Sequence, residues 1–181
     1  MRRAAMGFTM VEVLVAVLLL AVGLVGALAM QAHAMRTRQE SALLSEALQA
    51  AATLADHIRA NAAQSSAYLG FAFDATQAGA LSGAPACAAT PCDAAALVRY
   101  QLDEFRRQLA ASLPSARARV CRDAALAADG QLHWPCSGDA AAPLVIKIGW
   151  RSRTPGGASD ASTAMPGIAL PVALPLAGGV P

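Results

Sequence analysis

A long uncharged apolar run near the N-terminus constrains the fold of this chain more than any other feature. Residues 13–32 contain no ionisable side chain, and the next full positive charge is Arg36. A helix of about 20 apolar residues is long enough to cross a bilayer. One carboxylate, Glu12, stands directly before the run. Because a charged side chain in a membrane helix costs about 2.5–3.5 kcal/mol to insert, Glu12 is a candidate functional residue.

The junction before the apolar run has a specific order of residues. A leader with arginines at positions 2 and 3 precedes the sequence GFTMVEV at residues 7–13. This order, followed by an apolar run of spanning length, resembles the prepilin signal of the type IV pilin family and of its pseudopilin relatives. The resemblance implies that prepilin peptidase cleaves after Gly7 and N-methylates Phe8. It also implies that Glu12, then the fifth residue of the mature chain, acts in assembly.

Cleavage after Gly7 would give Glu12 a charged partner. The new amine on Phe8 would be cationic and close to the hydrocarbon, and Glu12 would pair with that amine on a neighbouring subunit in a filament. Such a pair offsets the desolvation of both charges. It also sets the axial step between subunits, as a buried polar residue sets the register of a coiled coil. The alternative is that Glu12 lies at the headgroup boundary of an ordinary anchor.

The N-terminus has two other interpretations. One is a secretory signal peptide, because residues 27–29 and 32–34 have the A-x-A pattern of a cleavage site. The other is a plain single-pass anchor, which the run length allows. The run is longer than the core of a usual signal peptide and an acid precedes it, which favours the prepilin interpretation. In all three, the leader arginines stay in the cytoplasm, and the rest is exported across the inner membrane.

Five segments follow from these patterns. They are a prepilin leader at 1–7, a transmembrane and assembly helix at 8–35, an amphipathic continuation of the helix at 36–62, a periplasmic globular head at 63–151, and a flexible tail rich in Pro, Gly and Ala at 152–181. The predicted fold class is α+β. The resemblance implies a type IV pilin fold, in which the long helix packs on a small C-terminal antiparallel β-sheet. An extra helix is expected in the connecting region.

Helical periodicity continues after the apolar run. Apolar residues at i, i+3, i+4 and i+7 predict a stripe that packs on the sheet. They are Leu44, Ala47, Leu48, Ala51, Leu54, Ala55 and Ile58. A second helix is predicted from Asp93, an N-cap residue, to about Leu113. Asp103 and Glu104 point in different directions on it and are interpreted as a solvated face rather than as paired catalytic carboxylates.

Strand patterns follow the second helix. Residues 116–120 and 132–136 are short candidates, and Asp129-Gly130 is a turn signal before the latter. Residues 144–151 alternate strongly and predict a half-buried strand, with Leu144, Ile146, Ile148 and Trp150 on one face. We expect these strands to form an antiparallel meander. Repeated prolines between 152 and 181 are interpreted as preventing regular structure there.

The four cysteines are Cys87, Cys92, Cys121 and Cys136. An even number of cysteines in an exported chain indicates disulfides. Chain order favours Cys87–Cys92 and Cys121–Cys136, although four cysteines allow three connectivities. A zinc site is the alternative, but the spacings lack the usual tight pairs, and His133 is the only nearby histidine. We therefore predict disulfides, with no metal.

Charge and motifs exclude several classes of function. The net charge is +2 and the positive residues are scattered, so direct binding of nucleic acid is not expected. The histidines, at positions 33, 57 and 133, are dispersed, and no nucleophile motif or phosphate-binding loop is present. We expect no cofactor and no enzymatic activity.

Two stretches bear on the type of pilin. Residues 54–61 have the sequence LADHIRAN, and a cysteine pair precedes the second helix. Both resemble PilV-type minor pilins. The resemblance implies a protein that joins other minor and major pilins and takes part in assembly or priming of a type IV pilus, with the inner membrane as its site before assembly. The alternatives are a pseudopilin of type II secretion and a membrane-anchored periplasmic binding or adhesion module that does not polymerise.

Overall fold

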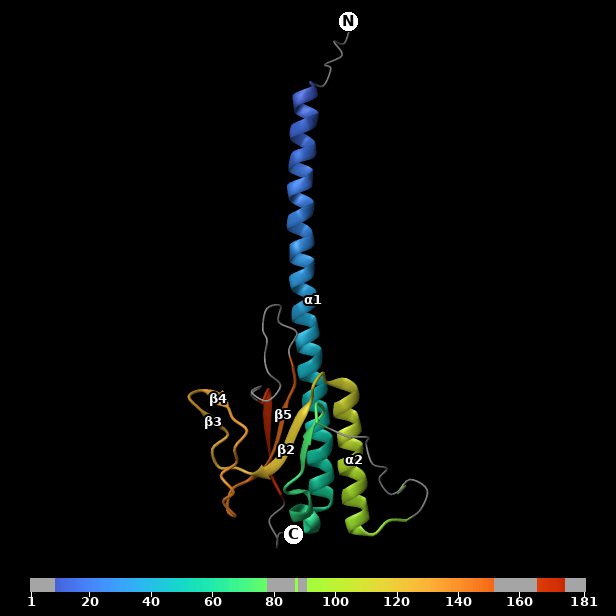
Figure 1. Cartoon of the computed structure of the whole chain (residues 1–181), viewed down its shortest axis with the longest axis vertical. Helices are drawn as coiled ribbons and strands as arrows, with labels where there is room; N and C mark the ends of the chain where they lie inside the picture. The colour runs from blue at the N-terminus through green and yellow to red at the C-terminus, as the bar shows by residue number, and fades with distance from the viewer. Residues whose placement is uncertain (1–8, 78–86, 88–90, 152–165, 175–181) are drawn as a thin grey trace, which may run out of the picture. The chain divides into compact units, whose positions relative to one another are not determined.

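The computed structural model of the chain describes residues 9–77, 87, 91–151 and 166–174. A long N-terminal apolar helix is followed by a second helix and a small antiparallel sheet (Figure 1). This confirms the predicted α+β fold class and agrees with the type IV pilin fold. The chain forms two compact units, Met1–Ser41 and Ala42–Pro181.

Helix α1 spans Met10–Ala60 and so contributes to both units. The helix expected from residue 8 to 62 is confirmed over this range. In the first unit, every described side chain is exposed. In the second unit, α1 buries six mostly small residues: Ala47, Ala50, Ala51, Leu54, Ala55 and Ile58. The predicted stripe is wrong at Leu44 and Leu48, which remain 41% and 45% exposed, whereas Leu43 is partly buried against the core, so the packed face of α1 is rotated from the predicted one.

The main sheet has four antiparallel strands in the order β1-β2-β5-β6. They are β1 (Ala72–Asp74), β2 (Arg117–Arg122), β5 (Leu144–Gly149) and β6 (Ile168–Val172). A separate hairpin pairs β3 (Ala127–Ala128) with β4 (Gln131–Leu132). Its turn is the predicted Asp129-Gly130, with φ of 52° and 75°. Two successive positive φ values suit the twist of a tight hairpin, which confirms the turn prediction.

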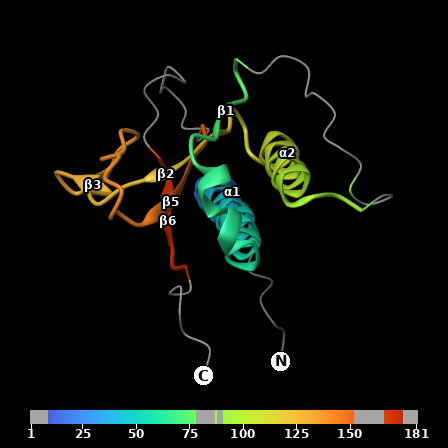
Figure 2. The same ribbon diagram turned by 90° about the horizontal axis from the view of Figure 1, so that it is seen from below.

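Helix α2 (Ala94–Ser112) begins where the sequence predicted, since the Asp93 carboxylate accepts a hydrogen bond from the N–H of Ala96 at 2.6 Å. A short 3₁₀ helix, η1 (Ala62–Tyr68), follows α1. The Tyr68 hydroxyl donates to the side-chain oxygen of Gln101 on α2. Viewed from below, α1 lies between α2 and the sheet (Figure 2). The core is therefore built on two sides of the C-terminal half of α1.

Three strand predictions need correction. The strand expected at 132–136 ends at Leu132 and pairs only with β3, because Pro135 cannot donate to a ladder. The strand at 144–149 is buried along its whole length rather than half-buried. The flexible-tail interpretation of 152–181 is wrong at β6, where Pro171 is tolerated because β6 is an edge strand. Residues 152–165 and 175–181 lie outside the described residues.

Candidate functional site

The predicted processing site lies at the edge of what the structure describes. Gly7 and Phe8 are outside the described residues. Thr9 caps the start of α1: its carbonyl oxygen accepts from the N–H groups of Glu12 (3.1 Å) and Val13 (3.3 Å). The Thr9 hydroxyl oxygen also faces the N–H of Glu12, at 3.3 Å. The Glu12 carboxylate is therefore in the first turn, where the positive end of the helix dipole favours an anion.

From Val13 to Met30, every residue of α1 is apolar. Its large side chains are 49–83% exposed from Met10 to Met35. Among the described residues, one helix is long and apolar enough to cross a membrane, with a mean hydropathy of 2.9 in its most apolar window. At about 1.5 Å per residue, the stretch from Val13 to Met35 measures about 35 Å. That length exceeds the roughly 30 Å hydrocarbon core of a bilayer.

The four cysteines form two disulfides in the head. Cys87 is joined to Cys92, with Cα atoms 5.4 Å apart, and Cys121 to Cys136, with Cα atoms 6.4 Å apart. This is the pairing that chain order favoured. The zinc alternative would need free thiolates, but all four sulfur atoms are held in these bonds. The first disulfide precedes α2, and the second joins β2 to the segment after the β3–β4 hairpin.

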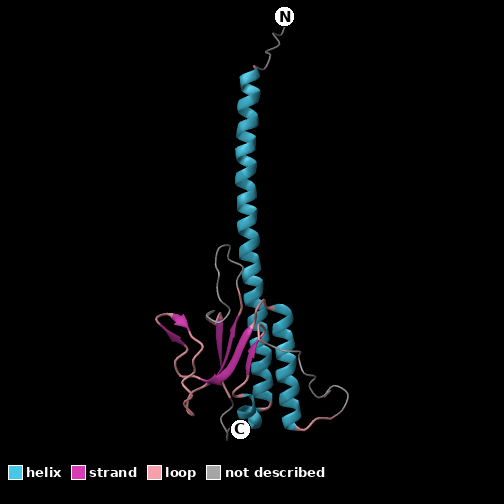
Figure 3. Ribbon diagram, in the orientation of Figure 1, coloured by secondary structure: helices cyan, strands magenta, loops and turns pink. Residues whose placement is uncertain are grey.

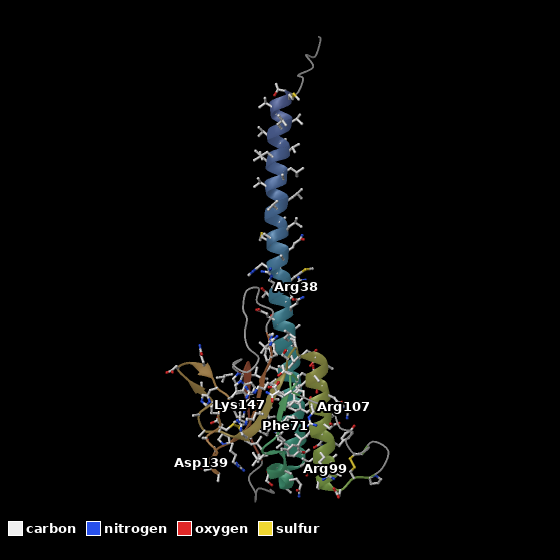
Figure 4. All side chains as sticks on the ribbon, in the orientation of Figure 1. Arg38, Phe71, Arg99, Arg107, Asp139 and Lys147 are labelled. Atoms are coloured by element: carbon white, nitrogen blue, oxygen red, sulfur yellow. A yellow bond between two sulfur atoms is a disulfide. The ribbon has the colours of Figure 1, made fainter. Side chains whose placement is uncertain are left out.

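A buried ion pair, which the sequence patterns did not predict, lies beside the second disulfide. The Lys147 side chain on β5 has no exposed surface, and its Nζ lies 2.5 Å from Oδ2 of Asp123, which is 1% exposed. Figure 4 labels Lys147 within the sheet region. The sequence does contain one sign of this ion pair, because Lys147 is the only lysine of the chain and lies in the most apolar strand. An isolated lysine there indicates a buried, paired cation.

The charge on Asp123 is held by several donors. Burial opposes ionisation of its carboxyl, but the Lys147 ammonium and the N–H groups of Ala125 and Ser137 outweigh burial and lower the pKa of Asp123. The two N–H groups both lie near its Oδ1 atom, at 3.1 and 3.2 Å. Asp123 is therefore ionised at neutral pH and forms a salt bridge with Lys147.

Asp103 and Glu104 on α2 are both paired with arginines. Asp103 is buried, contrary to the predicted solvated face, and its carboxylate contacts Arg107 at 3.1 Å and Arg106 at 3.6 Å. The Arg106 guanidinium also lies over the ring of Phe71, 5.7 Å from its centroid. Glu104 is exposed and pairs with Arg107. The buried carboxylate of Asp103 is thus neutralised by two arginines of the same helix.

Comparison with known proteins identifies the N-terminal segment. The family model described as the prokaryotic N-terminal methylation motif matches residues 2–28. Neither the curated proteins nor the solved structures gave a match to this chain. The matched segment contains Gly7, Phe8 and Glu12 and extends into the apolar part of α1. The chain therefore carries the prepilin-type signal of type IV pilin-like and pseudopilin proteins.

This class is defined by processing and assembly rather than by catalysis. The motif implies cleavage by prepilin peptidase, assembly with other pilins and a structural rather than an enzymatic role. The motif and the exposed apolar half of α1 together indicate membrane anchoring.

Proposed function

We propose that this chain is a minor pilin of the PilV type that takes part in assembly or priming of a type IV pilus. The observation that carries the proposal is the methylation motif at residues 2–28, which continues into the N-terminal half of α1, where the large apolar side chains from Met10 to Met35 are exposed. Such a helix is covered by lipid before assembly and by other pilin helices in a filament. The α+β head supplies the surface for further contacts.

The proposed mechanism rests on helix packing and one charge pair. After cleavage at Gly7, the methylated amine of Phe8 pairs with Glu12 of a neighbouring subunit. Gly23 and Ala27 form a small-xxx-small pair on α1, and no atom lies within 4 Å of the place where a Cβ on Gly23 would stand. Small residues let membrane helices approach closely. The apolar surface holds the subunit in the bilayer, and the Glu12 pair sets its axial position.

N-terminal mass spectrometry of the chain recovered from host membranes tests the processing step. We expect a mature chain that begins at N-methylated Phe8. A chain beginning at Met1 would mean an ordinary anchor. A chain beginning at Met30 or Met35 would mean cleavage of a signal peptide after residue 29 or 34. Each of these alternative starts would remove the basis for the Glu12 pair.

Incorporation into filaments tests the role of Glu12. We expect Glu12→Ala to be inserted and cleaved normally but to be lost from sheared pili. Glu46→Ala is the matched control, because Glu46 is an exposed carboxylate on the same helix outside the apolar segment. Normal recovery of Glu12→Ala in sheared pili would contradict the assembly role.

Co-purification distinguishes the pilus from its rivals. The wild-type chain should appear in sheared pili and be absent from the type II secretion apparatus. Recovery with the secretion apparatus alone would identify a pseudopilin. Recovery in membranes with no filament fraction would identify an anchored periplasmic module that does not polymerise.

A further inference from the structure

Segment 123–143 leaves the sheet after β2 and returns to it at β5, and we call it the flap. It contains the β3–β4 hairpin, which lies on the side of the sheet away from α1 (Figure 3). Its base is closed by backbone bonds from Asp123 N–H to Pro143 O (3.0 Å) and from Gly138 N–H to Arg122 O (3.1 Å). The Arg122 guanidinium also donates to Ala142 O at 2.9 Å.

The outer face of the sheet carries both the ion pair and the disulfide. Inner-face residues such as Val120 and Ile146 belong to the core with α1, so their neighbours along each strand point outward. Cys121 is opposite Val145, and Arg119 is opposite Lys147. Cys121 and Lys147 are therefore diagonal neighbours on the outer face, beneath the flap.

The ammonium of Lys147 holds the flap at three points. Besides Asp123, it donates to His133 O at 2.7 Å and to Pro135 O at 2.8 Å. All three acceptors belong to the flap, and the three ammonium protons are thereby used. Because an unpaired buried charge is strongly destabilising, any position of the flap that separates the Lys147 ammonium from these three acceptors is disfavoured.

The ion pair also forms hydrogen bonds with the two residues that flank Cys136. The Pro135 carbonyl oxygen, on one side, accepts from the Lys147 ammonium, and the Ser137 N–H, on the other, donates to Asp123 at 3.2 Å. Asp123 itself lies two residues after Cys121 along the chain. The buried pair thus fixes the backbone around both cysteines of the second disulfide.

We propose that the Asp123–Lys147 pair forms independently of oxidation and positions Cys136 against Cys121, so that it directs formation of this disulfide. The bond closes by thiol–disulfide exchange with a glutathione-type oxidant: one thiolate attacks the oxidant and releases one reduced thiol, and the second cysteine then displaces the other. The ion pair raises the effective concentration of the second cysteine in that closing step. The cysteines of Cys87–Cys92 are only five residues apart, so closure of that bond depends less on contacts between distant segments.

The first experiment uses the wild-type full chain in detergent micelles with both disulfides reduced. Because Lys147 is the only lysine, an amine-acylating ester can modify just one side chain, which is found on the arginine-bounded peptide 123–151. We expect acylation of Lys147 to be at least about tenfold slower than in the urea-unfolded chain, equivalent to about 1.4 kcal/mol. Equal rates would show that the pair needs the disulfide and would overturn the proposal.

The second experiment follows oxidation of the reduced chain by oxidised glutathione, with each disulfide mapped by mass spectrometry. Lys147→Met should slow closure of Cys121–Cys136 about tenfold and leave Cys87–Cys92 unchanged, so the latter is an internal reference. The matched control is Arg119→Met, which removes the exposed cation opposite Lys147 and should change neither rate. Asp123→Asn tests the other partner in the same way. An unchanged ratio of the two closure rates in Lys147→Met would overturn the proposal.

Discussion

The packing of α1 on the sheet can be measured with one substitution and a control on the same helix. Leu54 is 1% exposed and belongs to the core cluster that joins α1 to β2 and β5. Leu48, less than two turns earlier, is 45% exposed. Leu54→Ala and Leu48→Ala change the same side chain on the same helix, so their intrinsic helix propensities cancel in the comparison.

The expected magnitude follows from burial. Leu54→Ala removes three buried carbon atoms, and at about 0.8 kcal/mol each, the lost transfer free energy is about 2.4 kcal/mol. The cavity left between a helix and a sheet adds to this, which gives a total of about 2.5–5 kcal/mol. Leu48→Ala should change the free energy of unfolding by no more than about 0.5 kcal/mol, since its side chain is largely exposed already.

Urea unfolding of the full chain in detergent micelles measures the difference. Trp150 packs against the core, so its fluorescence reports on the head. With a slope of about 2 kcal/mol per M, the midpoint of Leu54→Ala should fall by about 1.3–2.5 M and that of Leu48→Ala by less than about 0.3 M. Equal shifts in the two variants would refute the packing of this part of α1 on the sheet.

Three further predictions concern the head. Because the folded pKa of Asp123 lies below its usual value of 3.8, its contribution to stability is present above about pH 4 and is lost as pH falls through the folded pKa. The urea midpoint of Asp123→Asn should therefore depend less on acid pH than that of the wild type. Identical pH profiles of the two midpoints would contradict this prediction. Asp93→Ala removes the acceptor of the Ala96 N–H and should cost about 1 kcal/mol in the same assay, whereas Asp93→Asn should retain most of the stability; equal losses would exclude capping by this side chain. A Cβ on Gly167 would lie 2.7 Å from the Trp150 ring. Gly167→Ala should therefore lower the free energy of unfolding of the head by about 1–3 kcal/mol and shift the tryptophan fluorescence. An unchanged spectrum and an unchanged urea midpoint would argue against this contact.

Helices and turns could be predicted from the sequence because their signals are local. Asp93 as a cap and the Asp129-Gly130 turn each depend on residues within a few positions of one another. The boundaries of α1 were also close, since no proline interrupts it. The disulfide pairing that chain order favoured is the pairing in the structure.

Strand burial could not be predicted, because it depends on what covers the second face of the sheet. Alternation around Lys147 indicated a solvated side, yet the flap covers that side and gives the ammonium three oxygen acceptors. In the same way, the prolines of the C-terminal region indicated irregular structure, so β6 was not predicted. The pairing of β6 with β5 depends on a free sheet edge rather than on local propensity.

The sequence by itself determined the chemistry of the N-terminus. The prepilin-type order at residues 7–13 implies covalent processing, and the uncharged run after Glu12 is long enough to cross a bilayer; neither signal depends on tertiary contacts. Only the tertiary structure decided that Lys147 and Asp123 are buried and paired. The two residues are 24 positions apart in the sequence, and their burial requires the flap to pack on β2 and β5. A charge is tolerated in a sheet interior only where distant segments supply its partners, and no local pattern encodes that meeting.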